Sequence, residues 1–171
     1  MEMSAEESPR RISSAMILAL RDHWIEACGA RAMAERADID PLKMPKLLPH
    51  VVLTEVHQKP LRFRYRLIGT WVTEMSGRDV TGRWLDEEIY GNNTERMLWA
   101  YHKCVDQRTP VAVREQVQFT AKEWIVIEAL LLPLGNDVDG VTMILSGVDD
   151  VANSVEKPPE GSRYTLDWQA P

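Results

Sequence analysis

Two consecutive runs of residues alternate between apolar and polar side chains, and this pattern constrains the fold more than any other feature of the chain. The runs are HVVLTEVH (residues 50–57) and LRFRYRLIG (residues 61–69), and the stretch QKP separates them. A period of two places successive side chains on opposite faces of a strand, so the runs predict a β-hairpin. In its second strand we expect Leu61, Phe63, Tyr65 and Leu67 to face one way and Arg62, Arg64 and Arg66 the other.

Helical patterns precede and follow this hairpin. Ser13 to Cys28 predicts an amphipathic helix, because apolar residues fall on one stripe and Gly29 supplies a stop. The prolines of PLKMPKLLPH break the next segment into single turns. A short helix is predicted from Thr70 to Ser76, and a longer one runs from a capping signal at Asn92 through Val105.

Three further strands follow the longer helix. They are VAVREQVQF, EWIVIEALLLPL and VTMILSGV, and the last two are separated by a turn rich in Gly and Asp. The order of elements predicts an α+β fold with a five-stranded antiparallel sheet, short helices on one face and an N-terminal flanking helix. We divide the chain into an N-terminal tail and flanking helix (1–30), a domain (31–150) and a flexible C-terminal tail (151–171).

Composition and motifs argue against several classes of function. The formal net charge is -6, from 26 acidic and 20 basic residues, which disfavours broad binding to nucleic acid or to an anionic membrane. We find no Ser-His-Asp signature, phosphate loop or metal-ligand spacing, so no enzymatic activity is predicted. The first residues lack the order of an export signal, and no apolar run reaches the length of a membrane span. We therefore expect a cytoplasmic protein with reduced thiols.

Three segments carry a family resemblance. RADIDPLKMPKLLPHVVLTEV, RFRYRLIGTWVTEMSGRDVTGR and the EALLLPL that precedes Asp139-Gly140 resemble the compact single-domain PAS proteins of bacteria. The resemblance extends over roughly Ala27 to Asp149, and its most specific part is Tyr65 through Gly82. It implies a sensory or protein-interaction module that signals through a partner protein such as a sensor kinase.

The resemblance also implies a small cavity between the sheet and the short helices. A small-molecule sensor and a ligand-free adaptor with a filled core both fit the residues. We expect no cofactor, and the alternative is a haem held by His102. The cysteine motif of flavin-binding members is absent between Thr70 and Gly91. We interpret Cys104 as a small buried residue. The residues predicted to line the pocket are Trp71, Met75, Leu98, Tyr101, His102 and Val105.

Glu128 interrupts an apolar strand, and it shares a face with Trp124 and Leu130. If that face is buried, the carboxylate needs a partner, for which the arginines of RFRYR are the candidates. The alternative is that this is the outer face of the sheet, covered by the N-terminal helix in cis or across a homodimer, which we also expect. The predicted interface residues are Ile17, Leu20, Trp24, Arg62, Arg64, Arg66, Trp124 and Glu128.

Overall fold

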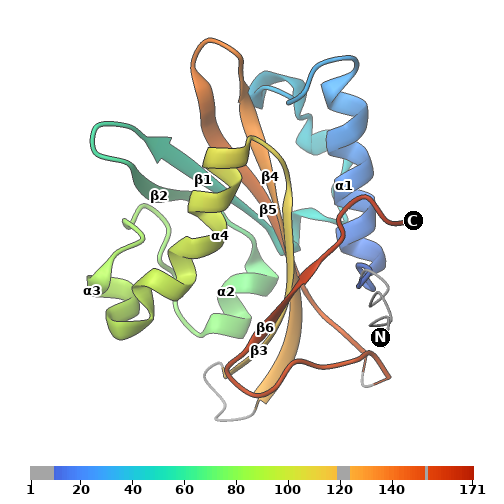
Figure 1. Ribbon diagram of the computed structural model, residues 1–171, viewed down its shortest axis with the longest axis vertical. Helices are drawn as coiled ribbons and strands as arrows, with labels where there is room; N and C mark the ends of the chain where they lie inside the picture. Colours follow the sequence, from blue (N-terminus) through green and yellow to red (C-terminus); the bar gives the residue numbers. More distant parts are fainter. Residues whose placement is uncertain (1–9, 119–123, 153) are drawn as a thin grey trace, which may run out of the picture.

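The computed structural model describes residues 10–118, 124–152 and 154–171, which fold around one antiparallel sheet (Figure 1). Its strands are β1 (Val51–His57), β2 (Arg62–Ile68), β3 (Val111–Gln118), β4 (Trp124–Asn136), β5 (Gly140–Asp150) and β6 (Arg163–Leu166). Their spatial order is β2-β1-β5-β4-β3-β6. The predicted fold class is confirmed, with β6 as a strand beyond the five that were predicted.

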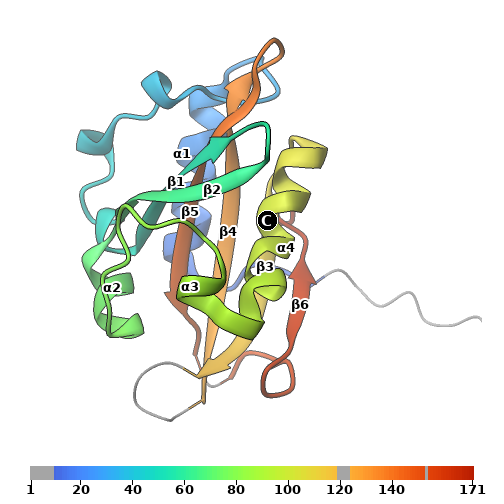
Figure 2. The same cartoon turned by 90° about the vertical axis from the view of Figure 1, so that its left-hand side faces the viewer.

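Helices cover both faces of the sheet (Figures 1 and 2). The helix α1 (Ala15–Cys28) lies on the face that we call outer. The opposite, inner face is covered by α2 (Thr70–Ser76), α3 (Glu87–Tyr90) and α4 (Thr94–Gln107). Between these elements lie short 3-10 turns: η1 (Arg36–Asp38), η2 (Pro41–Lys43), η3 (Leu48–His50) and η4 (Gly91–Asn93).

The helix α1 docks through the stripe that the sequence predicted. Ile17, Leu20 and Trp24 are buried against the outer face, and the indole of Trp24 donates a 2.9 Å hydrogen bond to the carbonyl of Pro133. The helix approaches the backbone of β5 closely at Gly147, where an added Cβ would lie 2.7 Å from Leu20 Cδ2. Each buried apolar side chain contributes about 1.5–3 kcal/mol, so this stripe holds α1 on its own chain.

A β-bulge changes the facing of one predicted residue. Leu53 pairs with Leu67 and Thr54 pairs with Tyr65, so Arg66 is the extra residue on β2. Because a bulge shifts the alternation by one, Leu67 lies on the outer face with Leu53, whereas Tyr65 lies on the inner face. The prediction that Leu67 faces the same way as Phe63 and Tyr65 is therefore wrong.

The free edge of β2 is covered by a segment of its own chain. The amide of Gly82 donates to the carbonyl of Tyr65, the amide of Tyr65 donates to Arg83, and that of Leu85 donates to Phe63. Unpaired edge strands invite pairing with other chains, and these bonds close the edge of β2 from Phe63 to Tyr65.

The C-terminal segment differs from the predicted flexible tail. Residues 163–166 form β6, which pairs with β3, and the chain then crosses α1. There the guanidinium of Arg21 donates to the carbonyls of Trp168 and Ala170, and the ring of Trp168 packs edge-on to Trp24 at 6.0 Å. The sequence around KPPEG shows no apolar run. The ordered path of the C-terminal segment therefore depends on tertiary contacts, which a local pattern does not reveal.

Candidate functional site

A cluster of five hydroxyl groups lies on the inner face beneath α4. Tyr65 and Thr54 face each other on β2 and β1, and Ser146 lies on the same face of β5. Tyr101 of α4 packs over them, and the phenol of Tyr65 is hydrogen-bonded to that of Tyr90 at the end of α3. The cluster is walled by Phe63, whose ring lies 5.3 Å from that of Tyr101.

Burial keeps the phenols of this cluster protonated. Loss of solvent raises the pKa of Tyr101 to about 12, although the neighbouring hydroxyls of Thr54, Tyr65 and Ser146 oppose the rise. Burial likewise raises the pKa of Tyr65 and of Tyr90. At neutral pH these groups are uncharged hydrogen-bond donors and acceptors.

Two of the hydroxyls are buried beside the Tyr101 phenol without a hydrogen bond of good geometry. Thr54 has no exposed surface and Ser146 is 3% exposed, yet Thr54 Oγ1 and Ser146 Oγ find no partner of acceptable geometry among the described residues. A buried polar group left unbonded costs about 1–3 kcal/mol, so such groups usually have a water or a ligand as partner. Together with the phenols of Tyr65, Tyr90 and Tyr101, the two hydroxyls therefore form a polar cluster among mainly apolar side chains.

The structure distributes the predicted pocket residues over several places. Tyr101 belongs to the hydroxyl cluster, and Val105 packs beside it in the same inner core. Trp71 stacks on His50 at 4.5 Å, and Met75 is half-buried in α2. Leu98 and His102 line a groove of about 630 Å³ on the solvent side of α4. Of the six residues, Tyr101 alone belongs to the cluster of hydroxyl groups.

Cys104 and His102 were the two groups considered for cofactor chemistry. The thiol of Cys104 is buried, which raises its pKa to about 12 and keeps it protonated. His102 is half-buried and its ring packs edge-on to Phe63 at 5.4 Å. Within the described part of the chain, no three His, Cys, Asp or Glu side chains gather as a metal site.

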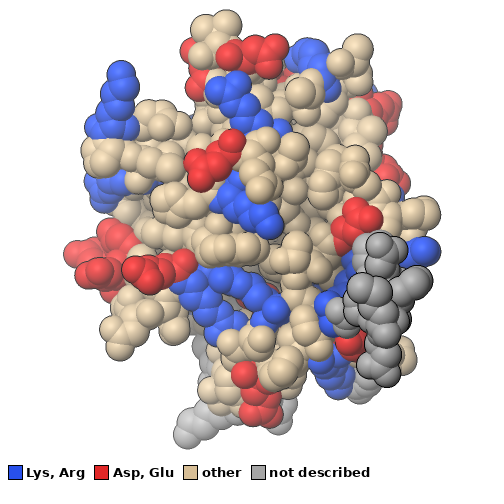
Figure 3. Space-filling model, in the orientation of Figure 1, with Lys and Arg blue, Asp and Glu red and all other residues tan. Residues whose placement is uncertain are grey.

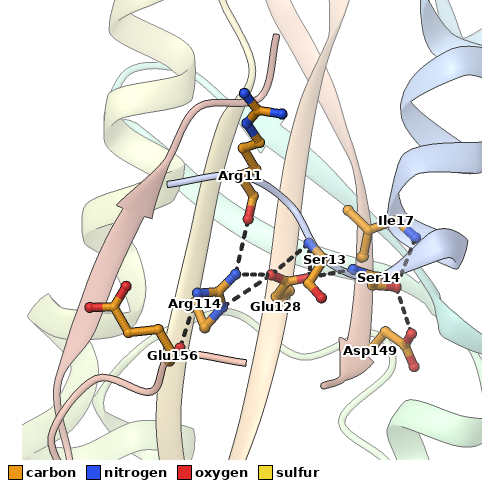
Figure 4. A network of polar contacts seen from close by, with 8 residues as sticks. All are labelled: Arg11, Ser13, Ser14, Ile17, Arg114, Glu128, Asp149 and Glu156. Carbon is orange, nitrogen blue, oxygen red and sulfur yellow. Dashed lines mark hydrogen bonds and ion pairs between the residues drawn. The ribbon is translucent and has the colours of Figure 1, made fainter. Parts of the chain in front are cut away.

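The outer face carries a second polar site, at the start of α1 (Figure 4). Glu128 on β4 has no exposed surface, and its carboxylate accepts the backbone amides of Ser13 and Ser14 at 2.6–3.0 Å. Arg114 on β3 lies opposite Glu128 and donates to Oε2 from two nitrogens, at 3.1 and 2.8 Å. The same guanidinium donates to the carbonyls of Arg11 and Glu156. The carboxylate thus fixes the point at which the chain enters α1.

The partner of Glu128 differs from the first prediction. Arg62, Arg64 and Arg66 lie on β2, and two strands separate β2 from β4. Three strand spacings amount to roughly 14 Å, beyond the reach of an ion pair. The alternative prediction is confirmed: Glu128 lies on the outer face, beneath the segment that leads into α1.

The three arginines have other contacts. The guanidinium of Arg62 stacks on the ring of Trp84 at 3.9 Å, that of Arg64 donates to the carbonyl of Gly82, and that of Arg66 lies 3.7 Å from Glu55. Trp124, at the far end of β4, is 40% exposed. The predicted interface residues therefore form two groups. Those of α1 and Glu128 are buried between α1 and the sheet, whereas the three arginines and Trp124 are exposed.

A chain of contacts joins the start of α1 to α2. The hydroxyl of Ser14 accepts the amide of Ile17 as an N-cap and donates to Asp149 on β5 at 2.6 Å. Asp149 lies 3.5 Å from the Nδ1 of His50, whose ring stacks on Trp71 of α2. Burial raises the pKa of Asp149, while Ser14 and His50 act against the rise.

Charge is mixed on one face of the molecule. Figure 3 shows Lys and Arg interspersed with Asp and Glu on the face that carries α4 and β3, without one broad field of either sign. On this face, the distribution gives no long basic track of the kind that a nucleic acid follows. Among the described residues, no helix is long and apolar enough to cross a membrane.

The described residues thus form an antiparallel sheet with short helices and a polar cluster on its inner face. A family model described as a PAS domain matches residues 12–148, and the chain belongs to this family. No curated protein matches the chain in sequence.

Solved structures share the fold at low sequence identity. The PAS domain of Bordetella pertussis BvgS matches with a TM-score of 0.50 and 14% identity, over 66% of this chain and 86% of that one. A Rhodobacter sphaeroides LOV protein gives 0.48 and 13%, over 68% and 70%. A sensory box sensor histidine kinase from Vibrio cholerae gives 0.45 and 12%, over 64% and 90%. With its PAS fold, the chain is a signal-sensing module.

Several residues of both sites were missed by sequence reasoning. Thr54 and Ser146 could have been predicted from the sequence, because each places a hydroxyl at an inward-facing position of an apolar strand. No sequence pattern identifies Arg114, Ser14 and Asp149, because their contacts with Glu128 and α1 depend on the order of the strands.

Proposed function

We propose that this protein is a non-enzymatic sensory module that binds a small uncharged molecule on its inner face and acts through a partner protein. The observation that carries the proposal is the pair of buried hydroxyls, Thr54 and Ser146, which lie beside the phenol of Tyr101 without a hydrogen bond of good geometry. A ligand that forms hydrogen bonds with these hydroxyls would offset the free-energy cost of burying them without a good hydrogen bond.

The surroundings of the hydroxyls favour an uncharged ligand. The phenols that surround the site are protonated, and the walls are Phe63 and aliphatic side chains. An ion placed here would lose its hydration without a counter-charge. The ligand class that fits is a small molecule with one or two hydrogen-bonding groups on an apolar body.

The strand β5 offers the route from this site to α1. Ser146 points to the inner face, Gly147 contacts Leu20 of α1, and Asp149 holds the N-cap of the same helix. A change in the position of β5 on ligand binding therefore biases the docking of α1. A coupling of about 1–3 kcal/mol changes affinity by roughly 5 to 150-fold, which is enough for a signal.

A ligand-free adaptor is the second candidate. It is favoured by the packing of Phe63, Tyr101 and Cys104 into the inner core, where they are nearly or fully buried. In either case the homodimer remains a proposal, and its contact surface is not the stripe of Ile17, Leu20 and Trp24, which is buried within one chain.

Native mass spectrometry and an absorption spectrum of the purified protein separate the two candidates. A sensor is expected to carry a co-purifying molecule of defined mass, and unfolding followed by refolding should remove it. A mass equal to that of the bare chain, with absorption from the aromatic residues alone, favours the adaptor.

A further inference from the structure

A second hollow lies on the outer face, beside the area that α1 covers. It has a volume of about 410 Å³ and lies between the segment of residues 36–49 and the strands β1, β2 and β5. We call it the outer groove; Figure 2 shows that segment running beside the hairpin. The residues that define its walls and floor are mainly apolar: Ile39, Met44, Val51, Leu53, Leu67 and Leu145.

The apolar surface extends beyond the groove itself. Leu42, beside it in η2, is 88% exposed, and Leu67 on its wall is 46% exposed. A small molecule is usually enclosed by its pocket, whereas a polypeptide also covers the apolar rim. The exposed leucines therefore favour a protein segment as the occupant.

The form of the segment follows from the strands and from α1. The edge of β2 is already paired with residues 82–85 from Phe63 to Tyr65, so an added strand finds no free edge along that stretch. The same outer face binds an amphipathic helix in α1, and Leu134 and Leu145 belong both to the core beneath α1 and to the groove. A second helix lying beside α1 continues this established interface.

The charges of the rim favour an acidic helix. Arg36 lines the groove, Lys43 and Lys46 are exposed residues of the same wall segment, and in the described ranges none of the three forms an ion pair. The acidic residues of the segment are occupied, since Asp38 pairs with Arg31 and Asp40 caps η2 through the amide of Leu42. These three cations give the segment a charge complementary to that of an anionic partner.

From these observations we propose that the outer groove docks an acidic amphipathic helix of a partner protein. The inference rests on the proposed function, because it locates the partner surface of the sensory module. It deepens that function by naming the chemistry of the partner: apolar residues at helical spacing flanked by Asp and Glu.

Selection from a displayed library of random peptides of about 16 residues, which as helices span roughly 24 Å, tests the proposal. The full chain is the target, and the Leu67→Asp variant is used for counter-selection. We expect enriched peptides with apolar residues at i, i+3, i+4 and i+7 and a net negative charge. Enrichment of basic or extended peptides, or no enrichment, overturns the proposal.

Matched variants locate the binding of an enriched peptide. In fluorescence anisotropy we expect Leu67→Asp, and also the double variant Lys43→Glu/Lys46→Glu, to weaken binding about tenfold or more. Ile25→Asp is the control, since Ile25 on α1 is 47% exposed, like Leu67. Equal binding by all three variants places the peptide elsewhere and contradicts the proposal.

Binding of dodecanoate to the same protein tests whether the groove is instead a site for a small amphiphile. If dodecanoate binds in a Leu67-dependent way while no acidic peptide does, the groove is a site for an amphiphile and the helix proposal fails. These outcomes are independent of the mass measurement on the inner face, so failure here leaves the proposed ligand site standing, and the reverse also holds.

Discussion

Arg114 and Glu128 lie opposite each other on neighbouring strands, with the guanidinium Nη2 2.8 Å from the carboxylate Oε2 and both side chains buried. The pair does more than satisfy two charges. Because the carboxylate also accepts the amides of Ser13 and Ser14, it joins the sheet to the entry of α1.

Breaking this pair from one side should be costly. Glu128→Leu leaves the guanidinium of Arg114 buried and removes the acceptor of two amides, so we expect a loss of about 3–5 kcal/mol in the free energy of unfolding. The double variant Arg114→Met/Glu128→Leu should lose less than the two single variants together. Urea denaturation of the four proteins measures the coupling, and additive losses would show that the pair is not coupled.

Ser14 and Ser13 should respond differently to the loss of a hydroxyl. The Ser14 hydroxyl caps α1 and donates to Asp149, so Ser14→Ala should cost about 1–2 kcal/mol. Ser13 is the control, because the contact described for it is made by its backbone amide, which Ser13→Ala keeps. Hydrogen exchange of the first turn of α1 should rise in the Ser14 variant alone; equal exchange in both would contradict the capping role.

The buried stripe of α1 should behave as core. Leu20→Ala removes a side chain without exposed surface, and we expect a loss of about 2–5 kcal/mol. Sedimentation of the folded variant should match that of the wild type, because the stripe packs within its own chain. A dimer that dissociates without loss of stability would instead place the stripe between subunits.

Alkaline pH should weaken the fold. The pKa of the Cys104 thiol is about 12 in the folded chain against 9.0 for a free thiol, so the unfolded state loses this proton first. The free energy of unfolding therefore falls as pH rises above about 9, by at most roughly 1.4 kcal/mol per unit for this group. Tyr101 adds a fall above about pH 10.

Two cysteine variants isolate the thiol. Cys104→Ala should flatten the dependence of the urea midpoint on pH between about 9 and 11, whatever it costs at neutral pH. Cys28→Ala serves as the comparison, because the Cys28 thiol is less enclosed and its pKa rise is opposed by Ala34 and Arg31. An unchanged slope in Cys104→Ala would mean that this thiol is not the titrating group.

The strands and helices were predictable because each carries its own local pattern. The alternation in RFRYR gave β2, and the spacing of Ile17, Leu20 and Trp24 gave the buried stripe of α1. The face of Leu67 was not predictable, because a one-residue bulge at Arg66 reverses the alternation without a local signal.

Prediction of the sites was limited by strand order. Tyr101, predicted to line a pocket, packs in the inner core, whereas Trp71 stacks on His50, which comes from another part of the chain. The partner of Glu128 required knowing that β3, and not β2, lies beside β4. Contacts of this kind are set by topology, which side-chain periodicity does not encode.

The mass of the double variant Thr54→Val/Ser146→Ala, compared with that of the wild type, tests the central claim most directly. Both changes remove a hydroxyl with little change of shape, and Thr165→Val on the exposed side of β6 is the control. We predict that native mass spectrometry finds a bound small molecule in the wild type and the control and loses it in the double variant. A bare chain in all three, with a double variant more stable by about 1–3 kcal/mol, would contradict the claim, since it would show that the hydroxyls are simply unbonded.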